Sequence, residues 1–237
     1  MDFGTTTYWF WFGFVGMLVG SAIIIIKSLK LREEHRYHAL ISLLVTTIAT
    51  ISYYALARGQ AEIVVSGDVV YIGRYLDWLF TTPLLLLSLL VIGLPPVQDL
   101  KMKNERIALI ASVLFANILM IMTGAFADLS SNTTDVVVWY TASCLWFLVV
   151  LWLMFGVVRK QVVASNNKAK SKAYINLLTF LSVIWVLYPV MWLLGSTGFN
   201  VISLINEAAL FAIMDISAKA VFGILVINSV IKLNKKA

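Results

Sequence analysis

The chain contains seven apolar stretches, each about long enough to cross a lipid bilayer as a helix. A bilayer core of about 30 Å requires roughly 20 residues at a rise of 1.5 Å per residue. The stretches are Tyr8 to Ile26, Tyr37 to Ala57, Val69 to Leu94, Ile107 to Ala127, Val136 to Val158, Ala173 to Gly195 and Ala208 to Ile231. Short segments with turn formers and most of the charges separate them. The sequence predicts an all-α, seven-transmembrane-helix bundle that forms one domain over residues 1–237.

The composition excludes the other broad classes of protein. Of the 237 residues, 61% are hydrophobic and 13% are charged, whereas a soluble domain carries about 25% charged residues. Four Pro, 13 Gly and one Cys fit neither collagen, nor disorder, nor a disulfide scaffold. The first stretch has neither a charged n-region nor a cleavage site, so we expect a first span and not a signal peptide. We expect a multi-pass protein of the plasma membrane, with the lipid bilayer as its surroundings.

The basic residues gather on one side of the predicted bundle. Fifteen of the 18 follow odd-numbered spans: Lys27, Lys30, Arg32, Arg36, Lys101, Lys103, Arg106, Arg159, Lys160, Lys168, Lys170, Lys172, Lys232, Lys235 and Lys236. The other side has Arg58 and the acids Asp2, Glu62, Asp68, Asp128, Asp135 and Glu207. The positive-inside rule then places the N-terminus outside and the C-terminus in the cytoplasm. The formal charge of +6 therefore indicates topology and not nucleic-acid binding.

Four charged residues lie inside the predicted spans, namely Arg74 and Asp77 in the third and Asp215 and Lys219 in the seventh. Each costs about 2.5 to 3.5 kcal/mol at mid-membrane, so we expect the two signs to pair. Such residues can be packing salt bridges of a transporter or receptor, but they more often mark an ion path or a ligand site. A buried lysine amine can also condense with an aldehyde, and the resulting iminium needs a carboxylate counter-ion. Asp77 and Asp215 could provide it.

Helical spacing groups further residues with these charges. Arg74, Asp77, Thr81 and Ser88 fall within about 60° of one another on one helix face, at 100° per residue. Aromatic residues are also frequent near mid-span: Trp78, Trp139, Trp146, Trp185, Tyr188 and Trp192. Aromatic side chains usually serve packing or the membrane interface. Rings inside the bundle would instead suit a long, flat, conjugated ligand.

Three segments on three predicted helices resemble the signatures of the microbial rhodopsins. They are Arg74 to Leu84, Trp185 to Pro189 and Asp215 to Lys219, and the resemblance extends over nearly the whole chain. It implies all-trans retinal bound to Lys219 as a protonated Schiff base, with Asp77 and Asp215 as counter-ions. In the pumps of this family, light isomerises the retinal and the Schiff-base proton passes to the carboxylate that matches Asp77.

The resemblance also implies roles for the residues around this centre. Thr81 would hydrogen-bond the Asp77 carboxylate, Tyr53 and Tyr188 would bond Asp215, and Arg74 would relay the charge change outward. The expected retinal contacts are Trp78, Trp185 and Trp192 along the polyene, Trp139 and Trp146 toward the ring, and Thr82, Leu85 and Asn117 in the pocket, with Leu85 at a colour-tuning position that favours a green pigment.

Three positions that distinguish the family's subtypes read Asp77, Thr81 and Ser88. An aspartate at the first favours proton transport. Outward pumps commonly have a carboxylic acid at the third as cytoplasmic proton donor, which an alcohol cannot replace. We therefore expect reprotonation from cytoplasmic water or an unidentified group, and a late photocycle step that slows as pH rises.

Two more departures concern the outer side and the histidines. Of the two outer carboxylates expected in a release site, only Glu207 is present, because Thr197 stands at the other position. The histidine that proteorhodopsins place near the counter-ion is missing, with Tyr53 at its position. Both histidines, His35 and His38, are predicted at the cytoplasmic edge.

The sequence thus predicts a light-driven outward proton pump, and not an enzyme. A sensory rhodopsin that signals through a transducer could share every pigment residue. Inward-pumping relatives typically replace the carboxylate matching Asp215 by proline, and this chain keeps it. A channel and a receptor without retinal are further alternatives. Family members are often trimers or pentamers, so we expect a homo-oligomer.

Overall fold

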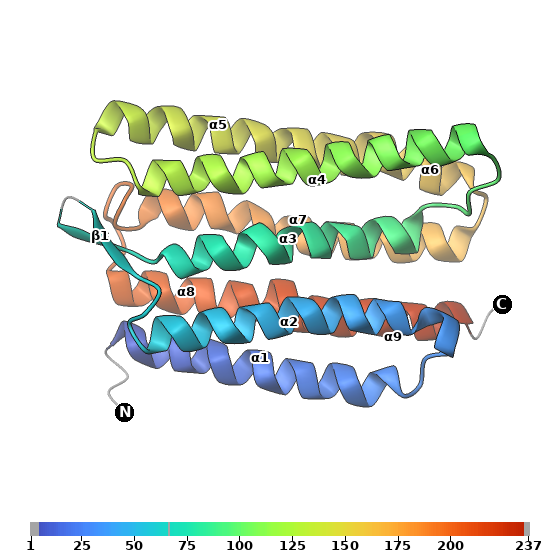
Figure 1. Ribbon diagram of the computed structural model, residues 1–237, viewed down its shortest axis with the longest axis horizontal. Coiled ribbons are helices and arrows are strands. Elements are labelled where there is room, and N and C mark those ends of the chain that lie inside the picture. Colours follow the sequence, from blue (N-terminus) through green and yellow to red (C-terminus); the bar gives the residue numbers. More distant parts are fainter. Residues whose placement is uncertain (1–4, 66, 235–237) are drawn as a thin grey trace.

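Long helices lie side by side and run the length of the molecule (Figure 1). The computed structural model describes residues 5–65 and 67–234, so Asp2, Ser66, Lys235 and Lys236 lie outside the described residues. Within this part, seven helices are long and apolar enough to cross a membrane. α1 begins and α9 ends at opposite ends of the bundle. The predicted fold class is confirmed, and the chain is an integral, multi-pass membrane protein.

The seven spans differ in how continuous their helices are. The first four are α1 (Thr6–Ser28), η1 (Glu33–His35) with α2 (Arg36–Ala57), α3 (Ile72–Gly93) and α4 (Leu100–Asp128). The fifth is α5 (Thr133–Trp152), the π-helical segment η2 (Leu153–Val158) and α6 (Arg159–Ala164), and the sixth is α7 (Lys168–Leu194). The seventh is α8 (Leu204–Ile216), the π-helical segment η3 (Ser217–Val221) and α9 (Phe222–Asn234).

Some helices begin before their apolar stretch. α4 starts at Leu100, where the Asp99 carboxylate accepts a hydrogen bond from the Met102 backbone N–H at 2.7 Å. α7 starts after Asn167, whose side chain accepts from the Lys170 N–H at 3.0 Å. Such caps satisfy donors that a helix start leaves unpaired. Hydropathy marks the part of a helix inside the membrane, whereas capping decides where the helix begins.

The start of the third stretch was predicted wrongly as helix. Val69 belongs to a short hairpin, in which β1 (Ile63–Val65) pairs antiparallel with β2 (Asp68–Val70) and Val65 lies opposite Asp68. Gly67 in the turn has a φ of +98°, a conformation that glycine adopts without strain. β-branched residues are apolar in a strand as in a helix, so hydropathy alone did not separate the hairpin from the span.

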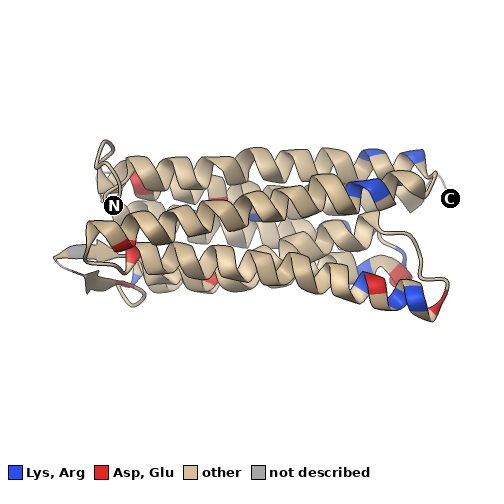
Figure 2. Cartoon of the chain, turned by 90° about the horizontal axis from the view of Figure 1, so that it is seen from above, with Lys and Arg blue, Asp and Glu red and all other residues tan. Residues whose placement is uncertain are grey.

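Charge distinguishes the two ends of the bundle, and burial distinguishes its inner spans from its outer ones. Lys and Arg gather where α9 ends, which we call the basic end, and the hairpin lies at the opposite, hairpin end (Figure 2). Consecutive spans contact each other and α8 returns to contact α1, so the chain order runs around the bundle. The third and seventh spans are the most buried, with 61% of the residues in their most apolar windows buried, against 22 to 39% for the others. Charged residues on these two spans are thus held in the interior.

The interior between Lys219 and the basic end is mainly aliphatic. Its largest cluster of buried side chains includes Leu86, Leu89, Leu90 and Phe222, each at most 1% exposed. Packing of this kind excludes water, because voids in protein interiors are mostly smaller than a water molecule. Any proton that crosses this half must therefore use the few polar side chains that are buried there.

Candidate functional site

Lys219 lies at the centre of the bundle, in the π-helical segment η3. The lysine is 1% exposed, and its Nζ is 2.9 Å from the Asp215 Oδ1. The same nitrogen also donates a hydrogen bond to Oδ2 of Asp77 on α3. The third and seventh spans thus bring one buried cation between two buried carboxylates. π-helical turns inside α-helices occur frequently at functional sites.

Asp215 is held by three further donors besides Lys219. The Tyr53 hydroxyl donates to its Oδ2 at 2.7 Å, and the Tyr188 hydroxyl donates to its Oδ1 at 2.6 Å. The Trp78 indole N–H donates to Oδ1 at 3.2 Å. Gly13 of α1 makes room for the Tyr53 ring, since a Cβ at that position would overlap it. Both tyrosines lie where the resemblance implies.

Asp77 has a sparser environment than Asp215. Its Oδ2 accepts from Lys219, but its Oδ1 is buried without a hydrogen-bond partner among the described residues. The Thr81 hydroxyl donates to the Asp77 backbone carbonyl at 2.8 Å, and it also lies within interaction range of the Asp77 carboxyl, as the resemblance implies. A threonine inside a helix has the carbonyl four residues before it within reach. Asp77 therefore keeps an oxygen free to accept a proton.

Arg74 points from this centre toward the hairpin end. Its Nη1 donates to the Glu207 Oε1 at 2.9 Å, and the two side chains are 8% and 10% exposed. The guanidinium carbon lies 4.4 Å from the Phe211 ring centroid. The second Glu207 oxygen accepts from the Ser196 backbone N–H at 3.0 Å, while the Arg74 Nη2 is buried without a partner among the described residues. This pair is the next charged group on the hairpin side of Asp77.

A second acid, Asp128, lies near this pair and was missed as a site residue. Asp128 ends α4, and its Oδ1 accepts a hydrogen bond from the hydroxyl of Thr197, in the loop after α7. Arg74 and Glu207 are both within electrostatic range of it. In the sequence it reads as one of several boundary acids, and only the return of the α7–α8 loop brings it here. Thr197 thus contributes to the site by holding a carboxylate instead of supplying one.

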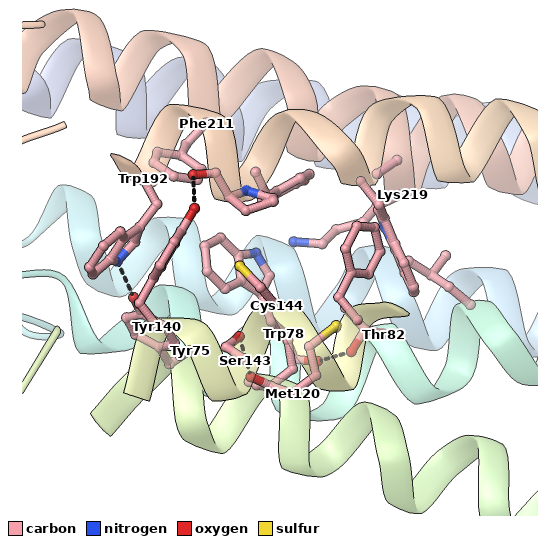
Figure 3. A pocket seen from close by; sticks show the side chains of 18 residues that line it. Tyr75, Trp78, Thr82, Met120, Tyr140, Ser143, Cys144, Trp192, Phe211 and Lys219 are labelled. Atoms are coloured by element: carbon pink, nitrogen blue, oxygen red, sulfur yellow. Dashed lines mark hydrogen bonds between the residues drawn. The ribbon is translucent and has the colours of Figure 1, made fainter. Parts of the chain in front are cut away.

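An apolar cavity leads away from the Lys219 amine (Figure 3). Its lining comes from five spans: Tyr75, Trp78, Thr82 and Leu85 of α3, Met120, Ile121 and Gly124 of α4, Tyr140, Ser143, Cys144 and Phe147 of α5, Trp185, Tyr188, Pro189 and Trp192 of α7, and Phe211, Ala218 and Lys219 of the seventh span. Tyr140 stacks on Trp192, with ring centroids 4.7 Å apart and planes 16° apart. Apolar walls with polar groups converging on one end are typical of a ligand pocket.

The residues present fit retinal. The long molecule needs an apolar slot with aromatic walls, which Trp78, Trp185 and Trp192 supply. Its aldehyde needs one amine, and Lys219 is the only lysine among the lining residues. The charge that a Schiff base would carry needs the carboxylates of Asp77 and Asp215, which contact that amine. The amine, the two carboxylates and the aromatic lining thus fit the same class of ligand, a long conjugated aldehyde.

The predicted positions of Trp139 and Trp146 at the ring end are wrong. Trp139 is 37% exposed and packs edge-on against Phe126, and Trp146 packs into the aliphatic core. Neither lines the cavity, where Tyr140 and Phe147 of the same span lie instead. One residue along a helix turns a side chain by about 100°, so an error of one position moves it off the cavity.

Two other predicted residues, Asn117 and Ser88, are not among the residues that line the cavity. Asn117 is fully buried, and its Nδ2 donates to the Thr82 hydroxyl at 2.7 Å, so it supports Thr82 without lining the cavity. Thr82 itself and Leu85 line it as expected. Ser88 is 2% exposed and lies further toward the basic end, among the aliphatic side chains. An alcohol there leaves the third span without an acid in this half.

Comparisons with known proteins identify the family and agree with the fold. A family model described as "Bacteriorhodopsin-like protein" matches residues 4–233. Bacteriorhodopsin of Haloterrigena sp. (strain arg-4) is 32% identical over 95% of this chain and 88% of its own length. The solved thermophilic rhodopsin from Rubrobacter xylanophilus superposes with a TM-score of 0.89 at 32% identity, over 95% of this chain and 96% of the other.

A third similar protein is described by its activity. The solved rhodopsin of Coccomyxa subellipsoidea, described as a light-driven proton pump, gives a TM-score of 0.83 at 33% identity, over 94% of this chain and 96% of the other. The family model and the similar structures cover almost the whole length of the chain. The chain also has a buried lysine that contacts two carboxylates. The chain therefore belongs to the bacteriorhodopsin-like family of microbial rhodopsins.

Proposed function

We propose that this protein is a light-driven outward proton pump that binds all-trans retinal as a protonated Schiff base on the Nζ of Lys219. The observation that carries the proposal is the contact of this nitrogen with both Asp77 and Asp215 at the end of an aromatic cavity. The similarity to a rhodopsin described as a light-driven proton pump supports it. Retinal would supply the absorption of visible light and the isomerisation that drives the transfer.

Asp77 is the proton acceptor in this proposal. Hydrogen bonds to a carboxylate favour its charged form, and Asp215 accepts three of them besides its contact with Lys219. Asp77 has an oxygen without a partner, so a proton there displaces no existing donor. The difference in donors therefore supports Asp77 as the proton acceptor and a lasting negative charge on Asp215.

The proposed direction of proton transport rests on the positions of the charged groups nearest to Asp77. Arg74 and Glu207 continue from Asp77 toward the hairpin end, and the aliphatic core fills the opposite half. The positive-inside rule, applied to the Lys and Arg clusters, supports a cytoplasmic basic end and a hairpin end that faces outside. A neutralised Asp77 would attract the positive charge of Arg74, about one helical turn away on α3, less strongly, which would favour a shift of Arg74 toward Glu207 and proton release there.

Illumination of unbuffered cells that express the protein with retinal tests the proposal. We expect the medium to acidify in light, and an uncoupler to abolish the acidification, because protons leave through the hairpin end. Alkalinisation would mean inward pumping. No change of pH, from a protein with full visible absorption, would replace the pump by a sensor that signals through a transducer. A protein without visible absorption in the presence of retinal would refute the retinal site.

A glycine substitution tests the role of Glu207 without removing a titratable group. A Cβ on Gly195 would lie 2.6 Å from the Glu207 Oε2, so Gly195→Ala should displace this carboxylate from Arg74. We expect later proton release, observed with a pH-indicator dye during the photocycle. Gly156→Ala is the control, since its Cβ would have no neighbour closer than 3.7 Å. Unchanged release in Gly195→Ala would remove Glu207 from the release site.

The expected plasma-membrane location follows the family. The homo-oligomer, a trimer or a pentamer, stays a prediction. Crosslinking in native membranes would measure the number of subunits.

A further inference from the structure

One buried titratable side chain has no part in the function proposed above. His38 lies on α2 toward the basic end, is 4% exposed, and has a buried Nδ1 without a hydrogen-bond partner among the described residues. The neighbouring His35 lies at the same end and is half-buried, with 32% of its side chain exposed, and its Nδ1 is likewise without a partner among the described residues. A buried histidine with an unused nitrogen, close to an aqueous surface, has the properties of a proton carrier.

Hydroxyl groups continue from His38 along the same face of α2. Ser42 and Thr46 follow at intervals of four residues and are 3% and 0% exposed. The Ser42 hydroxyl donates to the His38 carbonyl at 2.9 Å, and the Thr46 hydroxyl accepts from Ser21 of α1 at 2.7 Å. Hydroxyl oxygens keep lone pairs for further bonds. These groups give α2 a polar stripe through the aliphatic half of the bundle.

This stripe approaches the seventh span close to Lys219. A Cβ on Gly223 would lie 3.1 Å from the Ser42 Cβ and 3.4 Å from its Oγ, so the absence of a side chain there brings Ser42 against α9. Gly223 is four residues, about one helical turn, from Lys219. His38 is one further turn from Ser42, which puts it about 12 Å from the level of Lys219 along the helix axis. The proposed route requires water to enter this closely packed half during the photocycle and to bond to the hydroxyls over this distance.

We propose, resting on the outward pump above, that His38 is the relay through which a proton from cytoplasmic water reaches Lys219. The neutral imidazole accepts a proton on one ring nitrogen and gives up a proton from the other, so its own charge is restored. The Lys219 nitrogen gains one proton and the cytoplasm loses one. Among the described residues, the groups that act electrostatically on His38 are His35 and Lys170 on α7, and the Tyr37 ring packs against His38 with centroids 4.3 Å apart. This route replaces the carboxylic acid that position 88 lacks.

Flash photolysis of the retinal-loaded pigment is the main test, with His38→Gln as the variant and His35→Gln as the control. General acid–base groups contribute about 100-fold or more to a rate. We therefore expect the late photocycle step to slow about 100-fold in His38→Gln and to stay unchanged in His35→Gln. Added imidazole should restore the rate in His38→Gln, because free imidazole can accept and donate protons in place of the missing side chain, which would not repair a purely structural defect.

Two further measurements distinguish a proton relay at His38 from a role in packing alone. In the double variant His38→Gln/Ser88→Asp, an internal acid bypasses the relay, and the late step should become fast again. Independently of any photocycle, ¹⁵N-histidine NMR of the protein without retinal should show His38, assigned by its loss in His38→Gln, as a neutral imidazole at neutral pH that exchanges protons with water. A His38 that stays doubly protonated there would overturn the relay.

The outcomes distinguish this inference from the proposed function. If the unmodified protein acidifies the medium in light and His38→Gln has the same late kinetics, the pump stands and the relay is wrong. If the unmodified protein does not acidify the medium, the pump itself is refuted. The visible absorption of each variant verifies that it has folded around retinal.

Discussion

Lys219→Ala should give a protein without colour in the presence of retinal. Lys219 is the only lysine among the described residues that line the cavity, so we expect no other side chain to form the proposed Schiff base. The substitution also leaves Asp77 and Asp215 buried without their cation, and the loss of one partner of a buried ion pair costs about 3–5 kcal/mol. We therefore expect a lower thermal unfolding temperature together with the loss of the visible band.

Lys219→Arg separates these two effects. The guanidinium keeps a positive charge between the carboxylates, and because it stays protonated it does not condense with the aldehyde. Its unfolding temperature should lie above that of Lys219→Ala, while the visible band is absent in both. A visible band in Lys219→Ala after addition of retinal would show that the ligand is attached elsewhere.

Asp77→Asn should stop transport completely and shift the absorption band to longer wavelength. The amide cannot accept the proton from the Lys219 nitrogen, and it removes one of the two negative charges that stabilise the positive charge there. Light-driven pH changes and the visible spectrum measure both effects in one sample. Asp135→Asn, an exposed acid in the first turn of α5, is the control and should leave both unchanged.

Asp215→Asn should behave differently from Asp77→Asn. Asp215 accepts from Tyr53, Tyr188 and Trp78, and an amide NH₂ cannot accept a hydrogen bond. We expect a lower unfolding temperature in addition to a change in colour. Transport that survives in Asp77→Asn would reverse the assignment of the two carboxylates.

The sequence was sufficient for the fold class and for the residues at the centre, since charges inside a membrane are rare enough to stand out. Arg74, Asp77, Asp215 and Lys219 have no charged counterparts elsewhere within the seven apolar stretches of the sequence. Helical spacing also gave their faces correctly, because the structure brings Lys219 between the two aspartates. In these two spans the polar side chains define which side faces inward.

In the fifth span, no polar side chains indicate which side of the helix faces inward. Only 22% of its apolar window is buried, and its residues are apolar on every side, so no polar face indicates which side contacts the cavity. Trp139 and Trp146 were consequently placed in the cavity when Tyr140 and Phe147 are there. The position of Asp128 depended on a loop return between distant segments, which no local pattern encodes.

The unequal halves of the interior have an electrical consequence for the proposed pump. A membrane potential falls mainly across the least polarisable part of its path, which here is the aliphatic half around Leu86, Leu89 and Phe222. Moving one charge through a potential of 100 mV costs about 2.3 kcal/mol. Proton uptake, and not release, would bear most of this work. The voltage that the protein generates would therefore slow its own uptake step first and so limit the gradient that it can build.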